Sequence, residues 1–323
     1  MRAIVVAEGD PQLAELPVPL PTPDQILVKV RAAALNRADL HVAAGHKHGA
    51  SGGPGAVIGI EWAGEIVQIG AAVPAGFRLG DAVMCSGAGG YAEYAVADWG
   101  RVHAMPPGMD FRQAAALPVA LQTSHEALAN SGGLRRGESV LVQGASSGVG
   151  LMTMQVAKVL GAALVIGTST TASRRSELGG FGADIAIDPS ATDWPAQVQE
   201  ATAGAGCDLV IDFVAGPTMN ANMQAARVRG RIVNVGRMGG FRGEFDFDLH
   251  SLRRIQYIGV TFRTRSKEEV RAIASEMKRD LWDALAAGAL RMPVSRSFAL
   301  ADAAAALDCT RGNAHFGKVV LDI

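Results

Sequence analysis

The chain has 323 residues, of which 30 are Lys or Arg and 31 are Asp or Glu, so its formal net charge is −1. This balance, without a basic tract, argues against nucleic acid as the main partner. Hydrophobic residues make up 49% of the chain, and its length is typical of two domains. No apolar run is long enough to span a membrane, the first residues do not resemble a signal peptide, and the three cysteines are far apart; together these features predict a cytoplasmic protein.

The first part of the chain predicts a largely antiparallel β domain. Short β-type runs, separated by Gly and Pro, occur at residues 26–30, 64–69, 82–85 and 94–97. Pro17, Pro19, Pro21 and Pro23 predict an extended segment ahead of these runs, because proline restricts both its own backbone and that of the preceding residue.

After residue 120, strand and helix signals alternate along the chain. Six short apolar runs predict strands, at residues 139–143, 164–167, 185–187, 209–212, 231–235 and 257–260. Alternation of this kind is typical of a doubly wound parallel sheet, the Rossmann architecture of α/β proteins. The final run, residues 317–323, is expected to return to the first domain. We therefore predict a cofactor domain at 119–289 and a catalytic domain formed by 1–118 and 290–323.

The strongest local signal is the sequence GASSGVG at residues 144–150, which directly follows a predicted strand and opens a helical pattern. Glycines in such a turn let the backbone approach a pyrophosphate, and the helix N-terminus offers free N–H groups to it. Ser146 stands where the strict pattern has its middle glycine. The residues expected to hold the pyrophosphate are Gly144, Ser147, Gly148, Val149 and Gly150.

The end of the next predicted strand indicates which dinucleotide is bound. NAD-binding units usually carry an acidic residue there, but residues 167–176 contain none and instead offer hydroxyls and two arginines. Hydroxyl and guanidinium groups suit the 2′-phosphate of NADPH, so the sequence predicts NADPH as cofactor. Residues at the end of a later strand, Asn234, Val235 and Gly236, are expected on the same ligand-binding edge of the sheet.

Several motifs in a fixed order resemble the medium-chain dehydrogenase/reductase superfamily, in its zinc-independent quinone oxidoreductase branch. They are NRAD at 36–39, GIEWAG at 59–64, GDAV at 80–83, GGYAEY at 89–94, GASSGVG at 144–150 and GKVVL at 317–321. The resemblance implies a GroES-like catalytic domain, a Rossmann domain and a homodimer. It also implies 2′-phosphate contacts from Ser169 and Arg174, with Thr170 and Arg175 as neighbours, and a nicotinamide contact from Thr123. Phe262, Asn313 and Lys318 are further cofactor candidates.

Zinc-dependent relatives in this superfamily place a metal-binding His where this chain has Ile60, and a Cys in the segment that here holds Asn36 and Asp39. They also carry a cluster of four cysteines, whereas Cys85 is the only cysteine before residue 207. We therefore expect no metal. His41, His46 and His48 form an alternative ligand set, but their Gly-rich surroundings favour a loop at the edge of the substrate pocket.

Without a metal to polarise an isolated ketone, the expected substrates are quinones or α,β-unsaturated carbonyl compounds, which are already electron-poor. The resemblance assigns Asn36 to substrate orientation. It places Lys47 and His41 where enoyl-reductase and quinone-reductase relatives, respectively, often carry a tyrosine. Two alternatives stay open: an enoyl-thioester reductase, and a non-catalytic NADPH-binding protein that acts as a redox sensor.

Overall fold

The computed structural model describes residues 1–7, 10–49 and 51–323 and divides the chain into two compact units. The first comprises Met1–Val119, Phe262–Lys278 and Arg291–Ile323; the second comprises Ala120–Thr261 and Arg279–Leu290. The sequence-based boundaries assigned residues 262–278 to the second unit. The structure groups them with the first, where Arg271 binds Asp98 Oδ2 at 2.6 Å and Asp24 Oδ2 at 3.1 Å.

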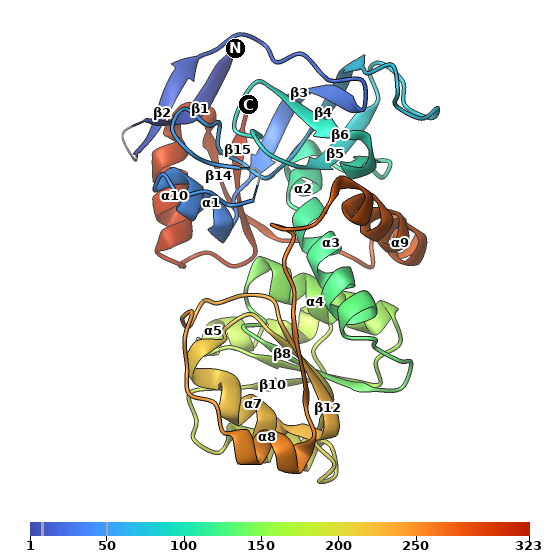
Figure 1. Cartoon of the computed structure of the whole chain (residues 1–323), viewed down its shortest axis with the longest axis vertical. Coiled ribbons are helices and arrows are strands. Elements are labelled where there is room, and N and C mark those ends of the chain that lie inside the picture. The colour runs from blue at the N-terminus through green and yellow to red at the C-terminus, as the bar shows by residue number, and fades with distance from the viewer. Residues whose placement is uncertain (8–9, 50) are drawn as a thin grey trace. The chain divides into compact units, whose positions relative to one another are not determined.

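The first unit is built around a mostly antiparallel sheet (Figure 1), in the order β14-β15-β3-β4-β5-β7, with β6 also paired to β3. Only β14 and β15 are parallel to each other. The chain's last strand, β15, pairs with β3, as expected for a strand that returns to this domain. The strands are β3 (Gln25–Ala34), β4 (Glu61–Ile69), β5 (Ala82–Ser86), β6 (Tyr94–Asp98), β7 (Val102–Ala104), β14 (Val294–Ala299) and β15 (Lys318–Asp322).

Smaller elements complete the first unit. β1 (Arg2–Ala7) pairs antiparallel with β2 (Asp10–Glu15), and the helices are α1 (Arg37–Ala43), α2 (Phe111–Ala115) and α10 (Ala303–Arg311). Trp62 and Tyr91 are fully buried in the core of this unit, and an added Cβ on Gly59 would lie 2.3 Å from the Tyr91 ring. The glycine before Ile60 therefore permits close packing of the motif at 59–64.

The second unit holds a six-stranded, fully parallel sheet in the order β10-β9-β8-β11-β12-β13. The strands are β8 (Ser139–Gln143), β9 (Leu164–Thr168), β10 (Ile185–Ile187), β11 (Cys207–Asp212), β12 (Ala226–Asn234) and β13 (Gln256–Gly259). The order reverses between β8 and β11, and such a switch point is where doubly wound sheets bind ligands at the carboxyl ends of their strands. The predicted fold class is confirmed.

Helices lie on both faces of this parallel sheet, with α4 on one side and α7 and α8 on the other (Figure 1). The helices are α4 (Gly148–Val159), α5 (Ala172–Arg175), α6 (Trp194–Ala201), α7 (Met219–Ala225) and α8 (Phe247–Arg253). α3 (Pro118–His125), continued by a π-helix at Glu126–Ser131, and α9 (Lys267–Ala286) contain residues of both units. Among the described residues, no helix has the length and apolarity that crossing a membrane requires.

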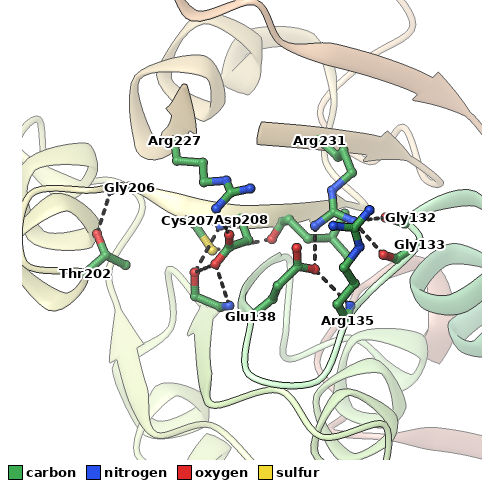
Figure 2. Close-up of polar contacts among 12 residues, drawn as sticks. Gly132, Gly133, Arg135, Glu138, Thr202, Gly206, Cys207, Asp208, Arg227 and Arg231 are labelled. Carbon is green, nitrogen blue, oxygen red and sulfur yellow. Dashed lines mark hydrogen bonds and ion pairs between the residues drawn. The ribbon is translucent and has the colours of Figure 1, made fainter. Parts of the chain in front are cut away.

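Polar side chains stabilise the end of the parallel sheet where β8 and β11 begin (Figure 2). Arg231 donates to the carbonyls of Gly132 and Gly133 and pairs with Glu138 at 2.5 Å. Next to it, Arg227 pairs with Asp208, whose carboxylate accepts hydrogen bonds from the N–H and hydroxyl of Ser139. These contacts close the end of the sheet opposite to the switch-point edge.

Candidate functional site

The glycine-rich turn after β8 lies at the switch point and requires glycine at two positions, for the backbone conformation at Gly144 and for close packing at Gly150. Gly144 has a φ of +74°, and an added Cβ would lie 2.9 Å from Met238 Cε. An added Cβ on Gly150 would lie 2.5 Å from the carbonyl oxygen of Gly144. Gly144 therefore serves the turn itself, and Gly150 serves the close approach of α4 to the strand end.

Ser147 is the N-cap of α4. Its Oγ accepts a hydrogen bond from the Gly150 N–H at 3.1 Å and donates one to the Gly144 carbonyl at 2.8 Å. The structure thus gives this hydroxyl a role in shaping the turn. Gly148 and Val149 occupy the first helical turn, where backbone N–H groups have no acceptor within the helix, and both are partly exposed. These N–H groups are suited to an anion.

A buried chain of polar side chains supports this turn and connects three neighbouring strands. Gly144 N donates to Thr168 Oγ1 at 3.1 Å, Thr168 donates to Gln143 Oε1 at 2.8 Å, and Gln143 donates to Asn222 Oδ1 at 2.9 Å. Asn222 in turn donates to Asp212 Oδ2 at 3.0 Å. Sequence reasoning missed this network; the available signal was a polar residue at the carboxyl end of each strand.

Asp212 also organises the next two turns. Its Oδ1 accepts hydrogen bonds from the N–H groups of Val214 and Ala215, while its backbone carbonyl accepts from Val235 and Gly236 at 2.9 and 3.1 Å. Burial raises the pKa of Asp212, opposed by the hydrogen bonds that its carboxylate accepts from Val214, Ala215 and Asn222. The segment at 234–236 is therefore held against the end of β11, at the carboxyl end of the parallel sheet.

The residues predicted to bind the 2′-phosphate lie at and after the end of β9. Ser169 is 5% exposed, and its hydroxyl donates to Ser146 Oγ at 3.0 Å, which connects this strand end to the glycine turn. Arg175 donates to the Ser169 carbonyl at 2.7 Å and pairs with Asp188 at 3.0 Å. The Arg175 guanidinium is thus paired with a carboxylate. Thr170 is exposed, and Arg174 is half-buried.

Thr123 lies on α3 and is half-buried. The neighbouring Ser124 is fully buried, and its hydroxyl lies 2.9 Å from the hydroxyl of Thr153 on α4. The helix that bears Thr123 is therefore fixed to the helix that opens with the glycine turn. Within the second unit, the structure brings together the residues predicted at 144–150, 169 and 234–236.

In the first unit, Asn36 and Lys318 belong to a buried polar cluster around Glu61. Lys318, 4% exposed, contacts Glu61 Oε1, donates to Asn36 Oδ1 at 2.6 Å and approaches the Leu35 carbonyl at 3.5 Å. Asn36 donates to Glu61 Oε1 at 2.8 Å, and Val119 N donates to Glu61 Oε2 at 2.9 Å. The Lys318 ammonium, predicted near the cofactor, is engaged inside this unit by a buried carboxylate.

Asp39 is the second buried carboxylate of the cluster and is fully buried. Its Oδ2 accepts hydrogen bonds from Asn36 N at 2.8 Å and Tyr91 OH at 2.9 Å, while its Oδ1 has no hydrogen-bond partner among the described residues. Burial is the main cause that raises the pKa of Asp39 to about 7; Glu61 adds to the rise and Lys318 opposes it.

The raised pKa predicts a pH dependence of stability that Asp39→Asn should remove. The native state holds the Asp39 proton more tightly than the unfolded chain, where the pKa is near 3.8. The protonated Asp39 carboxyl therefore stabilises the native state fully below pH 4. This contribution to the free energy of unfolding is lost as the pH rises towards 7, by at most about 1.4 kcal/mol per pH unit. Urea unfolding at pH 5, 6, 7 and 8 should show that the free energy of unfolding of the variant rises relative to that of the wild type as the pH increases. A difference in free energy that stays constant with pH would contradict the prediction.

The remaining predicted residues lie in exposed or half-buried parts of the first unit. His41, near the end of α1, and Lys47 in the loop that follows are both exposed, and the His41 and His46 rings lie 6.5 Å apart. Phe262 is half-buried, with the Arg265 guanidinium 5.6 Å from its ring centroid. Asn313 is exposed, with a φ of +53°.

The side chains at the zinc-ligand positions do not suit a zinc ion. Ile60 has no donor atom, and the neighbouring Glu61 is bound to the Lys318 ammonium. Within residues 1–7, 10–49 and 51–323, no group of three or more His, Cys, Asp or Glu side chains is placed to hold a metal. Of the three free cysteines, Cys85 and Cys207 are buried, and burial raises the pKa of the Cys207 thiol to about 12.

Comparison with known proteins gives consistent matches along the chain. The family model "Alcohol dehydrogenase GroES-like domain" matches residues 22–107, and "Zinc-binding dehydrogenase" matches residues 148–279. The chain is 30% identical to the quinone oxidoreductase of Rattus norvegicus and 32% identical to that of Lama guanicoe. In both cases 99% of this chain and 97% of the relative are covered.

Solved structures extend the comparison to the whole fold. An alcohol dehydrogenase superfamily protein from Novosphingobium aromaticivorans has a TM-score of 0.90 at 31% identity, covering 100% of this chain and 99% of the other. A mycobacterial protein complexed with NADPH has a TM-score of 0.87 at 26% identity, covering both chains fully. These matches, with the site described above, show that the chain belongs to the quinone oxidoreductase branch of the medium-chain dehydrogenase/reductase superfamily and is an oxidoreductase.

Proposed function

We propose that the chain is an NADPH-dependent, metal-free oxidoreductase that transfers hydride to quinones or α,β-unsaturated carbonyl compounds. The observation that carries the proposal is the pair of features at the switch point: a glycine turn that opens α4, and a neighbouring strand end with Ser169 and Arg174 but no carboxylate. The NADPH complex of a mycobacterial neighbour and the quinone oxidoreductase relatives support it.

The second unit supplies the groups that this cofactor needs. The first-turn N–H groups of Gly148 and Val149 would bind the pyrophosphate, and Ser147 would hold the turn in the conformation that presents them. Ser169, Thr170 and Arg174 would bind the 2′-phosphate, with Arg175 and Asp188 fixing the Ser169 backbone from behind. When bound, NADPH supplies the hydride.

The first unit supplies the proposed substrate groups. A quinone or conjugated enone accepts hydride without a Lewis acid, since the developing negative charge delocalises onto its oxygen. Asn36 is the proposed residue that orients the substrate carbonyl. Its own side-chain amide is held in one orientation, because its oxygen accepts a hydrogen bond from Lys318 and its nitrogen donates one to Glu61. Lys47, exposed in the loop after α1, is the proposed proton donor, with His41 as a second candidate.

Arg174→Ala should weaken NADPH binding about tenfold to a hundredfold while changing NADH binding little, because a charge-assisted contact to phosphate contributes about 1.5–3 kcal/mol. Fluorescence titration with both cofactors measures this. Arg136→Ala, a change to another arginine of the same unit that lies beside Gly161, serves as the control. Equal losses for NADPH and NADH would show that Arg174 does not contact the 2′-phosphate.

Steady-state assays test the reaction class directly. We expect NADPH oxidation with quinones and conjugated enones, no comparable oxidation of simple alcohols, no stoichiometric zinc by elemental analysis and full activity after treatment with a chelator. Zinc that is lost together with activity would overturn the metal-free part of the proposal. Absence of turnover with every electrophile would favour a non-catalytic, NADPH-binding redox sensor.

An enoyl-thioester reductase is the second candidate. The whole chain is 31% identical to a segment of a synthase from Mycobacterium tuberculosis, named for phthioceranic and hydroxyphthioceranic acid, of which it covers 15%. A preference for enoyl thioesters over free quinones, expressed as kcat/KM, would favour this candidate.

A further inference from the structure

Two segments of the first unit carry basic side chains and no carboxylate. Residues 40–60 contain His41, His46, Lys47 and His48, and residues 262–267 contain Arg263, Arg265 and Lys267; neither segment contains an Asp or a Glu. Acidic residues flank both segments in the sequence: Asp39 and Glu61 the first, Glu268 and Glu269 the end of the second. Lys267 is paired with Asp24 at 3.1 Å, so the positive charge of interest lies on Lys47, Arg263 and Arg265.

The backbones of the two segments are in contact. Gly49, with a φ of +62°, lies so close to the second segment that an added Cβ would be 3.3 Å from Arg263 Cα. The loop is also closed on itself, because His48 and Ser51 exchange backbone hydrogen bonds of 2.8 and 3.1 Å. The two segments are therefore packed together at Gly49 and Arg263, and the Arg263 charge acts on the neighbouring His48 imidazole.

Two of these basic side chains are exposed to solvent and two are half-buried. Lys47 and Arg263 are exposed, while His48 and Arg265 are half-buried. Burial lowers the pKa of His48, and the two charged groups that add to this effect, Arg263 and His41, are both basic. A neutral imidazole beside guanidinium and ammonium groups offers hydrogen bonding without adding to the repulsion.

We propose that Lys47, His48, Arg263 and Arg265, the basic loop surface, bind an oxyanion carried by the substrate, so that electrophiles with a carboxylate or phosphate group are preferred over neutral ones. Guanidinium groups bind both oxyanions, and clustered positive charge raises the local concentration of anionic substrates. The inference rests on the proposed function, since Lys47 belongs to the loop assigned there to the substrate.

Matched substrate pairs test the preference. One pair is an enone carboxylic acid and its methyl ester; the other is an enoyl thioester of coenzyme A and the same thioester of N-acetylcysteamine. For each pair, kcat/KM for the anionic substrate is divided by kcat/KM for the neutral one. This ratio is then compared between wild type and variants, so that differences in electrophilicity between the two substrates cancel. The first pair reports a carboxylate-binding surface and the second a phosphate-binding surface.

Arg263→Gln should lower this ratio about threefold to tenfold, and Arg263→Glu should lower it further, because the surface is solvated and each charge contributes modestly. Raising the salt concentration should lower the wild-type ratio in the same direction. Arg78→Gln, a change to an exposed arginine elsewhere in the unit, should leave the ratio within about twofold. Circular dichroism confirms that each variant is folded.

Two outcomes separate the inference from the proposed function. Turnover of the neutral substrates with ratios that are identical in wild type, Arg263→Gln and Arg263→Glu overturns the basic loop surface and leaves the proposed function intact. If no substrate is turned over, the proposed function fails. Calorimetric titration with the acid and the ester then decides the inference, which requires tighter binding of the acid by wild type than by Arg263→Glu.

Discussion

Lys318→Met should lower the free energy of unfolding by about 3–5 kcal/mol, because it leaves the buried Glu61 carboxylate without its cation. Lys318 is 4% exposed and Glu61 is fully buried, so water cannot replace the lost ammonium. Asn36 and the Val119 N–H still donate to Glu61, but neither carries a charge. Urea unfolding at pH 7 measures the effect.

The double variant Lys318→Met, Glu61→Gln is the control. It removes both charges while keeping similar side-chain volumes, and replacing a buried ion pair in this way is often close to neutral. We expect it to recover most of the stability lost in the single variant. A loss below about 1 kcal/mol in Lys318→Met would show that the pair is solvated in solution. NADPH titration of the folded single variant tests separately whether Lys318 contacts the cofactor, as the sequence predicted.

Lys47→Ala should lower kcat for a conjugated enone by about 10²- to 10⁴-fold, the usual contribution of a general acid. The enolate formed by hydride addition must be protonated, and Lys47 is the proposed donor from the loop after α1. A reduced quinone can take its protons from water, so the same variant should lose far less activity on a quinone. NADPH binding should change little. The comparison requires both substrates in the same assay.

Lys47→Arg distinguishes proton donation from charge. A guanidinium keeps the positive charge but does not release a proton at neutral pH, so the enone rate should stay low. Recovery of that rate in Lys47→Arg would mean that the residue acts only through its charge, as part of the basic loop surface. Full activity of Lys47→Ala on both substrates would remove Lys47 from the proposed mechanism.

Strands of the parallel sheet were the easiest elements to predict. β8 (Ser139–Gln143), which is buried at every position, and β10 (Ile185–Ile187), an edge strand with Ala186 exposed, both have the bounds that their apolar runs indicated. β2 (Asp10–Glu15) and β14 (Val294–Ala299) were not predicted. Both are mostly exposed and polar, and they are strands because a neighbour pairs with them.

The glycine turn of the proposed cofactor site was similarly predictable, because its residues are close together in the sequence. A turn from Gly144 to Gly150 and the N-terminus of α4 lie within one short stretch of sequence, and glycine has a direct conformational meaning there. The partner of Arg175 was not predictable from the sequence. It is Asp188, which the parallel pairing of β9 and β10 brings close enough to bind the Arg175 guanidinium.

The sequence by itself determined the fold class, the glycine turn at 144–150 and the absence of a ligating side chain at Ile60, because each depends on neighbouring residues or on residue identity alone. The tertiary structure decided the partners of Asn36, Lys318 and Glu61. Lys318 lies 282 residues from Asn36 and 257 from Glu61, so no local pattern reports their contact. A buried charge is stable only with a partner, and the pairing of β3 with both β15 and β4 brings Lys318 and Glu61 within reach of each other.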